Sequence, residues 1–182
     1  MRKILFILIF VVSSFEALAS VKLNIIDKLK DVENISFNFE QNINGKIENG
    51  SCVIKYPKKI NCKYDQGNRK VLVSNGKSLV VKTLSSYYIY PLKKTPLNLI
   101  LDKNFLLKKI KDLKERKIQN KFINFNFNEK ENDINLFFDI NTFNLVGWQT
   151  VDIYQNVSIT YLSAIRRNLK LNESLFLLPR EN

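Results

Sequence analysis

The two cysteines are the side chains of this sequence best placed for covalent chemistry. Cys52 and Cys62 stand five residues on either side of Pro57, so a hairpin turning at this proline would bring them opposite each other. In an oxidising compartment such a pair forms a disulfide, which we favour because two neighbouring free thiols rarely persist there. The alternative is a pair of small apolar residues on one face of a sheet, without a covalent bond.

Histidine is absent from the sequence, and its absence removes most other catalytic arrangements. Without it there is no usual general base, no histidine-activated nucleophile, and no ordinary zinc site. Glycine occurs only 5 times, and no phosphate-binding glycine loop is present. Lysine, aspartate and glutamate remain, but in no arrangement typical of an active site. We therefore expect a protein that is not an enzyme and that uses no metal or cofactor.

The N-terminus has the pattern of a secretory signal peptide. The basic leader Met1–Lys3 precedes an unbroken apolar run at Ile4–Val12, and Ala17-Leu18-Ala19 has the small-x-small form that signal peptidases cut. The run is shorter than the roughly 20 residues that a membrane span needs. Ser20 follows the predicted cut, where a lipoprotein signal would place a cysteine. We expect residues 1–19 to be removed after Ala19 and the rest to be exported without a lipid anchor.

The chain is strongly basic, with 29 lysines and arginines against 17 acidic residues and a formal net charge of +12. Such a balance can indicate binding to nucleic acid or to an anionic membrane. The basic residues are scattered rather than clustered, however, which favours ordinary surface charge with a weak attraction to anionic lipid. We therefore predict no nucleic-acid partner.

Much of the sequence alternates between apolar and polar residues with a period of two, as half-buried strands do. Asn44-Gly45 and Asn75-Gly76 are hairpin turn signals, and Glu48-Asn49-Gly50 is a further turn-rich stretch. So many alternating segments with short turns predict an antiparallel sheet of roughly ten strands with one apolar face. No linker or repeat divides residues 20–182, so we expect one domain.

Alternation also predicts which side chains share a face. In each predicted strand, every second residue is apolar and points to the same face. These residues are Phe37 and Phe39; every second residue in Cys52–Tyr56, Ile60–Tyr64, Ile123–Phe127 and Ile134–Ile140; Trp148; and Val157, Ile159 and Tyr161. Aromatic residues on such a face most often fill an ordinary core. Few helices are predicted to cover this apolar face. A poorly covered apolar face is either a binding surface or a site prone to aggregation.

Two longer segments have the spacing of amphipathic helices. Residues 20–34 place Val21, Ile25, Leu29 and Val32 on one side. Phe105–Ile118 carries apolar residues at helical spacing among many lysines. It fits a helix packed on its own core, a helix lying on a membrane, or a segment that is partly strand.

Thr95–Leu101 is predicted to form a short apolar helix. Thr95 suits the N-cap, and Pro96 suits the first helical position, where its missing N–H costs nothing. So short a helix is unstable alone and must dock on the sheet. It would then serve either as an ordinary capping helix or as a lid over an apolar concavity.

A series of short motifs runs along nearly the whole chain. In order they are Ile35–Gln41, Gly50, Tyr56-Pro57, Val73–Lys77, Tyr90-Pro91-Leu92, Thr95-Pro96-Leu97, Leu145–Asp152, Thr160, Asn168 and Phe176–Pro179. Together they resemble the LolA family of periplasmic outer-membrane lipoprotein carriers. No single motif is specific, but their order and spacing behind a signal peptide carry the resemblance. The Tyr-Pro-Leu-x-x-Thr-Pro-Leu form at 90–97 is most similar to the alphaproteobacterial branch.

The resemblance implies an α+β fold in which a curved antiparallel sheet forms an incomplete, half-open barrel covered by an N-terminal helix and short lid helices. It also implies a periplasmic monomer without a cofactor that binds the acyl chains of lipoproteins. Its partners would be an inner-membrane lipoprotein-releasing ABC transporter and an outer-membrane lipoprotein receptor. The alternative function is a periplasmic phospholipid- or glycolipid-binding protein or sensor with the same half-barrel.

The resemblance and the alternation together predict two sets of site residues. The lipid-binding cavity is expected at Phe37, Phe39, Ile54, Tyr56, Ile60, Tyr64, Phe125, Phe127, Phe138 and Trp148, and the lid at Thr95, Pro96, Leu97, Leu99, Ile100 and Leu101. The family commonly has an arginine before the turn proline, where it latches the lid. Here that position is Tyr56, which offers one hydroxyl instead of five fixed donors. We expect a weaker latch, or one supplied elsewhere, with Arg69 as a candidate.

Overall fold

The computed structural model of the protein describes residues 14–129, 132–151 and 156–181, with side chains from residue 21 onward. The strands within these ranges are β1 (Asn34–Ile43), β2 (Lys46–Lys55), β3 (Lys59–Tyr64), β4 (Val71–Asn75), β5 (Ser78–Lys82), β6 (Tyr87–Pro91), β7 (Arg116–Ile118), β8 (Phe122–Glu129), β9 (Asn132–Asp139), β10 (Leu145–Val151) and β11 (Val157–Arg167). The helices are α1 (Ser14–Lys30), α2 (Leu97–Ile100) and α3 (Lys103–Asp112), with short 3-10 turns η1 (Leu92–Lys94) and η2 (Glu173–Phe176).

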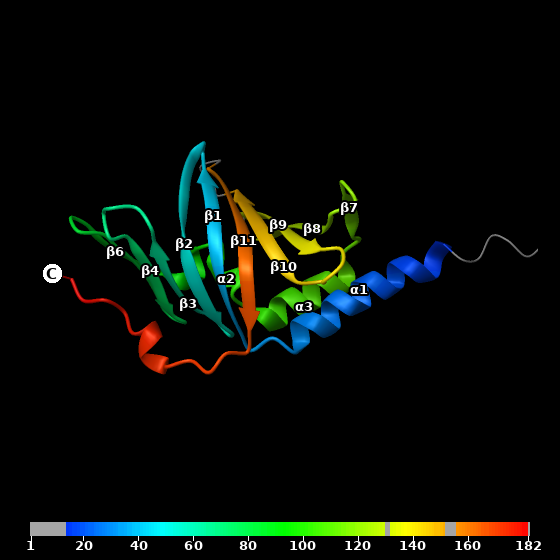
Figure 1. The fold of residues 1–182 in the computed structure, drawn as a ribbon, viewed down its shortest axis with the longest axis horizontal. Helices are drawn as coiled ribbons and strands as arrows, with labels where there is room; N and C mark the ends of the chain where they lie inside the picture. The colour runs from blue at the N-terminus through cyan, green and yellow to red at the C-terminus, as the bar shows by residue number, and fades with distance from the viewer. Residues whose placement is uncertain (1–13, 130–131, 152–155, 182) are drawn as a thin grey trace, which may run out of the picture.

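All the described strands form one antiparallel sheet, in the order β6-β5-β4-β3-β2-β1-β11-β10-β9-β8-β7. Neighbours in the sheet are neighbours in sequence except where β1 pairs with β11. Figure 1 shows a curved, open sheet with the three α-helices gathered on one side of it. The predicted α+β fold with an incomplete barrel is therefore confirmed.

Two of the three predicted glycine-containing turns are present in the structure, and the third is not. Gly45 and Gly76 adopt φ of +90° and +98°, a conformation that glycine takes without a steric cost. The predicted turn at Glu48-Asn49-Gly50 is wrong, because these residues lie inside β2. Gly50 is instead required by packing: a Cβ there would come within 2.8 Å of the Phe39 ring.

The disulfide between Cys52 and Cys62 is formed, as predicted. The two residues are direct cross-strand partners in the pairing of β2 with β3. Both side chains are buried in the main hydrophobic cluster, on the face that carries Ile54 and Ile60. The bond therefore fixes two strands at the centre of the apolar face.

The predicted faces are correct for most strands, but the prediction for β11 is wrong. Thr160 and Leu162 are buried, whereas Val157 and Tyr161 are exposed. The pairing explains the inversion, because Thr160 stands beside Trp148 of β10, whose side chain is buried in the core. Tyr161 lies on the outer face, where its ring is 6.4 Å from that of Phe137.

Helices α1 and α3 pack against each other as a layer over the inner face. The predicted apolar side of α1 is confirmed at Ile25 and Leu29, which are buried, but the helix ends at Lys30, before the buried Val32. Lys103, at the start of α3, donates to the carbonyls of Lys30 and Val32 at 2.9 Å, and so satisfies free acceptors at the end of α1. The predicted cleavage site at Ala19 falls where only the backbone is described, and the signal peptide stays a prediction.

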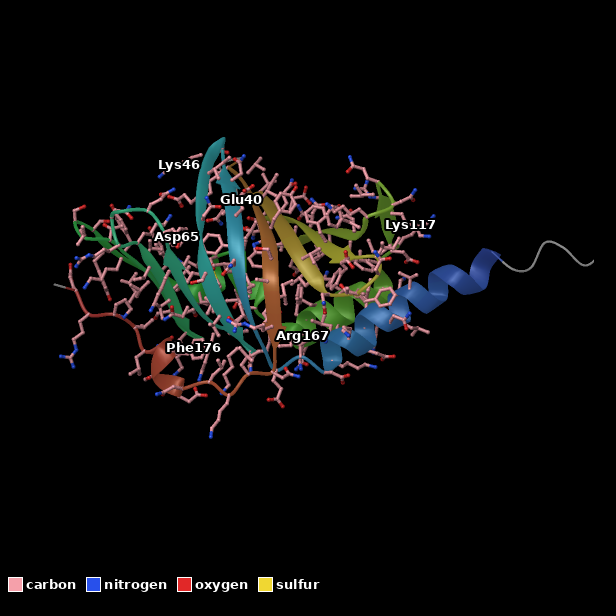
Figure 2. All side chains as sticks on the ribbon, viewed as in Figure 1. Glu40, Lys46, Asp65, Lys117, Arg167 and Phe176 are labelled. Atoms are coloured by element: carbon pink, nitrogen blue, oxygen red, sulfur yellow. A yellow bond between two sulfur atoms is a disulfide. The ribbon has the colours of Figure 1, made fainter. Side chains whose placement is uncertain are left out.

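The chain ends in a segment that lies on the outer face of the sheet. This outer segment (Asn172–Arg180) contains η2, which contacts β3 and β4. Figure 1 shows it in red beside these strands, and Figure 2 labels Phe176 within it. Phe176 is 3% exposed, and Val73 and Val80 are buried on the same face. These three residues lie outside the main cluster on the inner face.

Candidate functional site

All ten residues predicted to line a lipid-binding cavity face the concave side of the sheet and belong to one apolar cluster. All are buried except Tyr64, which is partly buried against that cluster. Their rings meet edge to face, as in Phe37 with Trp148 at 6.2 Å and Phe39 with Tyr64 at 5.0 Å. The structure therefore assembles this predicted set from strands that are far apart in sequence.

The face is covered more completely than the sequence suggested. Leu106 and Ile110 of α3 and Ile25 of α1 are fully buried, because the two helices pack side by side on the sheet. The expectation of a largely uncovered apolar surface is therefore wrong for the described residues. Any apolar ligand of this face has to displace part of its cover.

The predicted lid, Thr95–Leu101, forms a short part of this cover. Ile100 and Leu101 are 0% exposed, so the lid contributes to the core. Its described hydrogen bonds are local: Asn98 N–H donates to the Thr95 carbonyl, and Leu99 N–H to that of Pro96. Between its two ends the lid therefore contacts the sheet through side chains alone.

Single backbone hydrogen bonds to the turns of the sheet fix the chain just before the lid, at Leu92, and at its last residue, Leu101. Leu92 N–H donates to the Lys77 carbonyl at 2.9 Å, and Lys58 N–H donates to the Leu101 carbonyl at 2.7 Å. The Lys58 ammonium also pairs with Asp102 at 3.4 Å. Lys58 follows the turn proline, so the contacts at this end of the segment come from the residue after that proline.

Three expectations about the lid need correction. Thr95 does not cap α2 with its side chain; its hydroxyl donates to the Leu92 carbonyl at 2.9 Å, and Pro96 occupies the N-cap. Tyr56 is 9% exposed, and its hydroxyl forms no hydrogen bond with a described lid residue. Burial raises the pKa of Tyr56 well above its usual value. Arg69 is exposed in the turn between β3 and β4 and makes no described contact with the lid.

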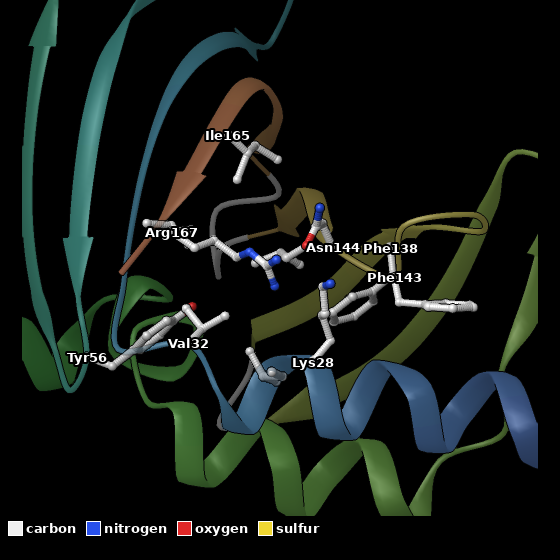
Figure 3. A pocket seen from close by; sticks show the side chains of 11 residues that line it. Lys28, Val32, Tyr56, Phe138, Phe143, Asn144, Ile165 and Arg167 are labelled. Atoms are coloured by element: carbon white, nitrogen blue, oxygen red, sulfur yellow. The ribbon is translucent and has the colours of Figure 1, made fainter. Parts of the chain in front are cut away.

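A hollow opens at the edge of the covered face, between the last turns of α1 and the ends of β1, β10 and β11. Its volume is about 20 Å³, room for roughly one water molecule. Figure 3 shows Tyr56 and Val32 on one side of it and Phe138 and Phe143 on the other. Tyr56 and Phe138 are both predicted cavity residues, so this hollow reaches the same face as the lid.

The far end of the inner face is polar, which the sequence did not reveal. Glu48 is 2% exposed and forms ion pairs with Lys46 and Lys70. Burial alone would raise its pKa, but the two lysines outweigh that effect and hold the pKa of this carboxyl below its usual range. Lys70 also lies 4.1 Å from the centre of the Tyr64 ring, and Tyr64 donates to Gln41 at 3.1 Å.

This polar cluster had a weak sequence signal, since Glu48 and Gln41 sit at apolar positions of their strands. Its carboxylate already has two partners, so it closes one end of the apolar face and is not left poised for proton transfer. Among the described residues, no three side chains of metal-ligating type come together. The arrangement can hold apolar chains and exclude water from them.

Within the described ranges, none of the helices combines the length and the hydropathy that a membrane span requires.

Solved structures with a similar fold come from several bacteria. An uncharacterized conserved protein from Thermus thermophilus matches at a TM-score of 0.51 with 10% identity, over 90% of this chain and 95% of that one. A LolA superfamily protein from Nitrosomonas europaea matches at 0.43 with 8% identity, over 87% and 98%. A putative outer membrane lipoprotein-sorting protein domain from Vibrio parahaemolyticus matches at 0.46 with 10% identity, over 85% and 95%.

Among curated proteins, none matches this sequence. The sequence model of the family described as outer membrane lipoprotein carrier protein LolA does match, over residues 30–178. This range runs from the end of α1 through every described strand to the outer segment. The sequence match and the open, helix-covered sheet agree: the chain belongs to the LolA family.

Proposed function

We propose that the protein carries acylated lipoproteins through the periplasm, with their acyl chains held against the inner face of the sheet. The observation that carries the proposal is the lid, an apolar segment fixed at both ends whose middle touches the sheet through side chains alone. An acyl chain makes the same kind of contact as Leu99 and Ile100, so it can replace them. Membership of the LolA family supports this role.

The physical task suits a covered apolar face. Moving an acyl chain of about fifteen methylenes from a membrane into water costs roughly 12 kcal/mol, at ~0.8 kcal/mol per methylene. A lipoprotein with several such chains does not desorb by itself. The carrier has to offer comparable hydrocarbon contact, and it also has to let the chains go. A lid that competes for the same face weakens binding, and this makes release possible.

In this proposal the chain is a monomer that works without a cofactor. It receives lipoproteins from an inner-membrane lipoprotein-releasing ABC transporter and delivers them to an outer-membrane lipoprotein receptor. Export through the predicted signal peptide would place it in the periplasm between the two.

A release assay tests the proposal. Spheroplasts of the organism that makes the protein are incubated with the purified protein, and the soluble fraction is analysed by mass spectrometry. Acylated lipoproteins in a one-to-one soluble complex with the protein are expected. Recovery of free phospholipid alone would favour a phospholipid or glycolipid carrier. An empty fraction, from a protein shown to be folded, would contradict both carrier functions.

A substitution in the lid tests whether the lid competes with acyl chains for the inner face. Ile100→Asp places a charge at a fully buried position, so the lid can no longer dock and stops competing for the face. The apparent affinity for a fluorescent acyl probe should rise about tenfold or more, and transfer to the receptor should fall. Asn98→Asp adds the same charge to the same helix at a partly exposed position and should change neither. Unchanged binding in both variants would remove the lid from the mechanism.

A further inference from the structure

The hollow beside α1 has a charged mouth that the proposed function does not use. Its described lining includes two cations, Lys28 and Arg167, and no carboxylate. Lys28 comes from the last turns of α1 and Arg167 from the end of β11. Figure 3 shows their charged ends directed toward the same space. Two like charges that face each other repel, and an anion between them removes the repulsion.

Two lysines of the helix layer have partners among the described residues. Lys22, also on α1, pairs with Glu115 at 3.3 Å, and Lys103 donates to two backbone carbonyls. The side chains of Lys28 and Arg167 form no hydrogen bond or ion pair with another described residue. Lys28 is half-buried and Arg167 is exposed.

Two of the acids beside the lining residues in sequence are engaged elsewhere, whereas the carboxylates of Asp31 and Glu33, on either side of Val32, are exposed. Asp27 accepts a hydrogen bond from the Lys30 ammonium at 2.9 Å. Asp139 accepts from the backbone N–H of Thr142 at 2.7 Å and from that of Asn141 at 3.1 Å. No carboxylate belongs to the described lining of the hollow, and the side-chain amide of Asn144 adds a further polar group to it.

Below the mouth the lining is apolar and continuous with the inner face. The floor consists of Leu29, Val32, Ile35, Tyr56, Phe138 and Leu145, all members of the main cluster. A charged mouth above an apolar floor matches a molecule with an anionic head and a hydrocarbon chain. The hollow holds only about 20 Å³, so a chain enters when α1 shifts away from the strands.

We infer that this hollow is an entry site for an amphiphile with an anionic head group. The carboxylate or phosphate lies between Lys28 and Arg167, and the acyl chain passes over the floor to the inner face. The inference rests on the proposed function, because the chain ends on the same apolar face, and it adds a head-group preference.

The test compares two fluorescent ligands with the same chain, cis-parinaric acid and its neutral methyl ester. The purified protein should bind the acid about tenfold or more tightly than the ester, since ionised acceptors form the stronger hydrogen bonds. The double variant Lys28→Gln, Arg167→Gln should bind the acid only as tightly as the ester, with ester binding unchanged. The control variant Lys63→Gln, Arg166→Gln makes the same change of charge on the outer face and should keep the preference.

Competition experiments identify the source of the anion. Oleate and oleoyl lysophosphatidic acid should displace the acid better than monoolein, which has the chain without the charge. Displacement by millimolar inorganic phosphate alone would assign the mouth to free anions and overturn the lipid inference.

The two failures are distinguishable. Equal binding of acid and ester by the original protein would overturn the head-group inference and leave the carrier function standing. So would an undiminished preference for the acid in the double variant, once its thermal unfolding midpoint is shown to match that of the original protein. Binding of neither ligand would overturn the carrier function itself.

Discussion

Two short segments cover opposite faces of this sheet, and they are attached in different ways. The lid contributes fully buried side chains to the inner face, but hydrogen bonds join only its two ends to the sheet. The outer segment buries chiefly Phe176 and adds polar contacts along its length. Lys55 and Lys59 pair with Glu173, Asn61 donates to the Leu175 carbonyl at 2.6 Å, and Lys82 donates to the Arg180 carbonyl at 2.7 Å.

The difference indicates which segment can exchange places with a ligand. Directional polar contacts are lost outright when a segment leaves, and a hydrocarbon chain cannot replace them. Side-chain contacts of the lid are non-directional and can be replaced by any apolar surface of similar area. We therefore propose that the outer segment stays in place and that the lid exchanges with a bound chain.

The largest expected effect comes from the outer segment. Phe176→Ala removes a buried ring, which typically costs about 3–5 kcal/mol of unfolding free energy. Urea denaturation measures this loss. Acyl binding per folded molecule should not change, because Phe176 lies outside the inner cluster. Weakened binding at full folding would show that the two faces are not independent.

A pair of neighbouring lysines gives a smaller and more selective comparison. Lys58→Ala removes the ion pair with Asp102, a partly exposed contact worth up to about 1 kcal/mol, so the lid opens more often. The initial rate of acyl-probe binding in stopped-flow fluorescence should rise by up to about fivefold. Lys59→Ala weakens only the attachment of the outer segment at Glu173 and should leave that rate unchanged. Equal effects of the two substitutions would contradict the division between the segments.

The smallest expected effect is a pH dependence confined to the outer segment. Hydrogen bonds and charges from Lys55 and Lys59 lower the pKa of Glu173 to about 2 from an ordinary value of 4.5. Because the folded pKa is depressed, this attachment is present above about pH 4.5 and is lost as the pH falls toward 2. Pepsin cleavage near Leu175 should become faster across that window, relative to Glu173→Gln at each pH. A constant ratio of the two rates would mean that Glu173 does not hold the segment.

The sequence predicted most of the fold because alternation reports directly on buried faces. Phe125, Phe127 and Phe138 were placed correctly, since each strand there carries bulky residues on one side only. The prediction was wrong for β11, where Tyr161 suggested an inward face that Thr160 occupies. Side-chain size decides little in such a strand. The bulge opposite Phe37 and the pairing with β10 determine which side chains of β11 face the core, and neither can be read from a single sequence.

The site was predicted less completely because its polar parts depend on tertiary contacts. The lid was found from Thr95-Pro96 and the leucines after it. The hydrogen bond from the Lys58 N–H to the Leu101 carbonyl was not predicted, because no residue type in the sequence indicates a backbone contact of this kind. Lys28 and Arg167 are two of many scattered basic residues. Only the pairing of β11 with β1 and the position of α1 bring them to one hollow.

The central claim is that acyl chains replace the lid on the inner face. Hydrogen–deuterium exchange with mass spectrometry tests it directly, by comparing peptides over residues 92–102 and 171–178 with and without bound cis-parinaric acid. The account predicts faster exchange in the lid peptide than in the outer one, and a further increase in the lid peptide alone when the acid binds. Slow exchange of both peptides, unchanged by an acid shown to be bound, would contradict it.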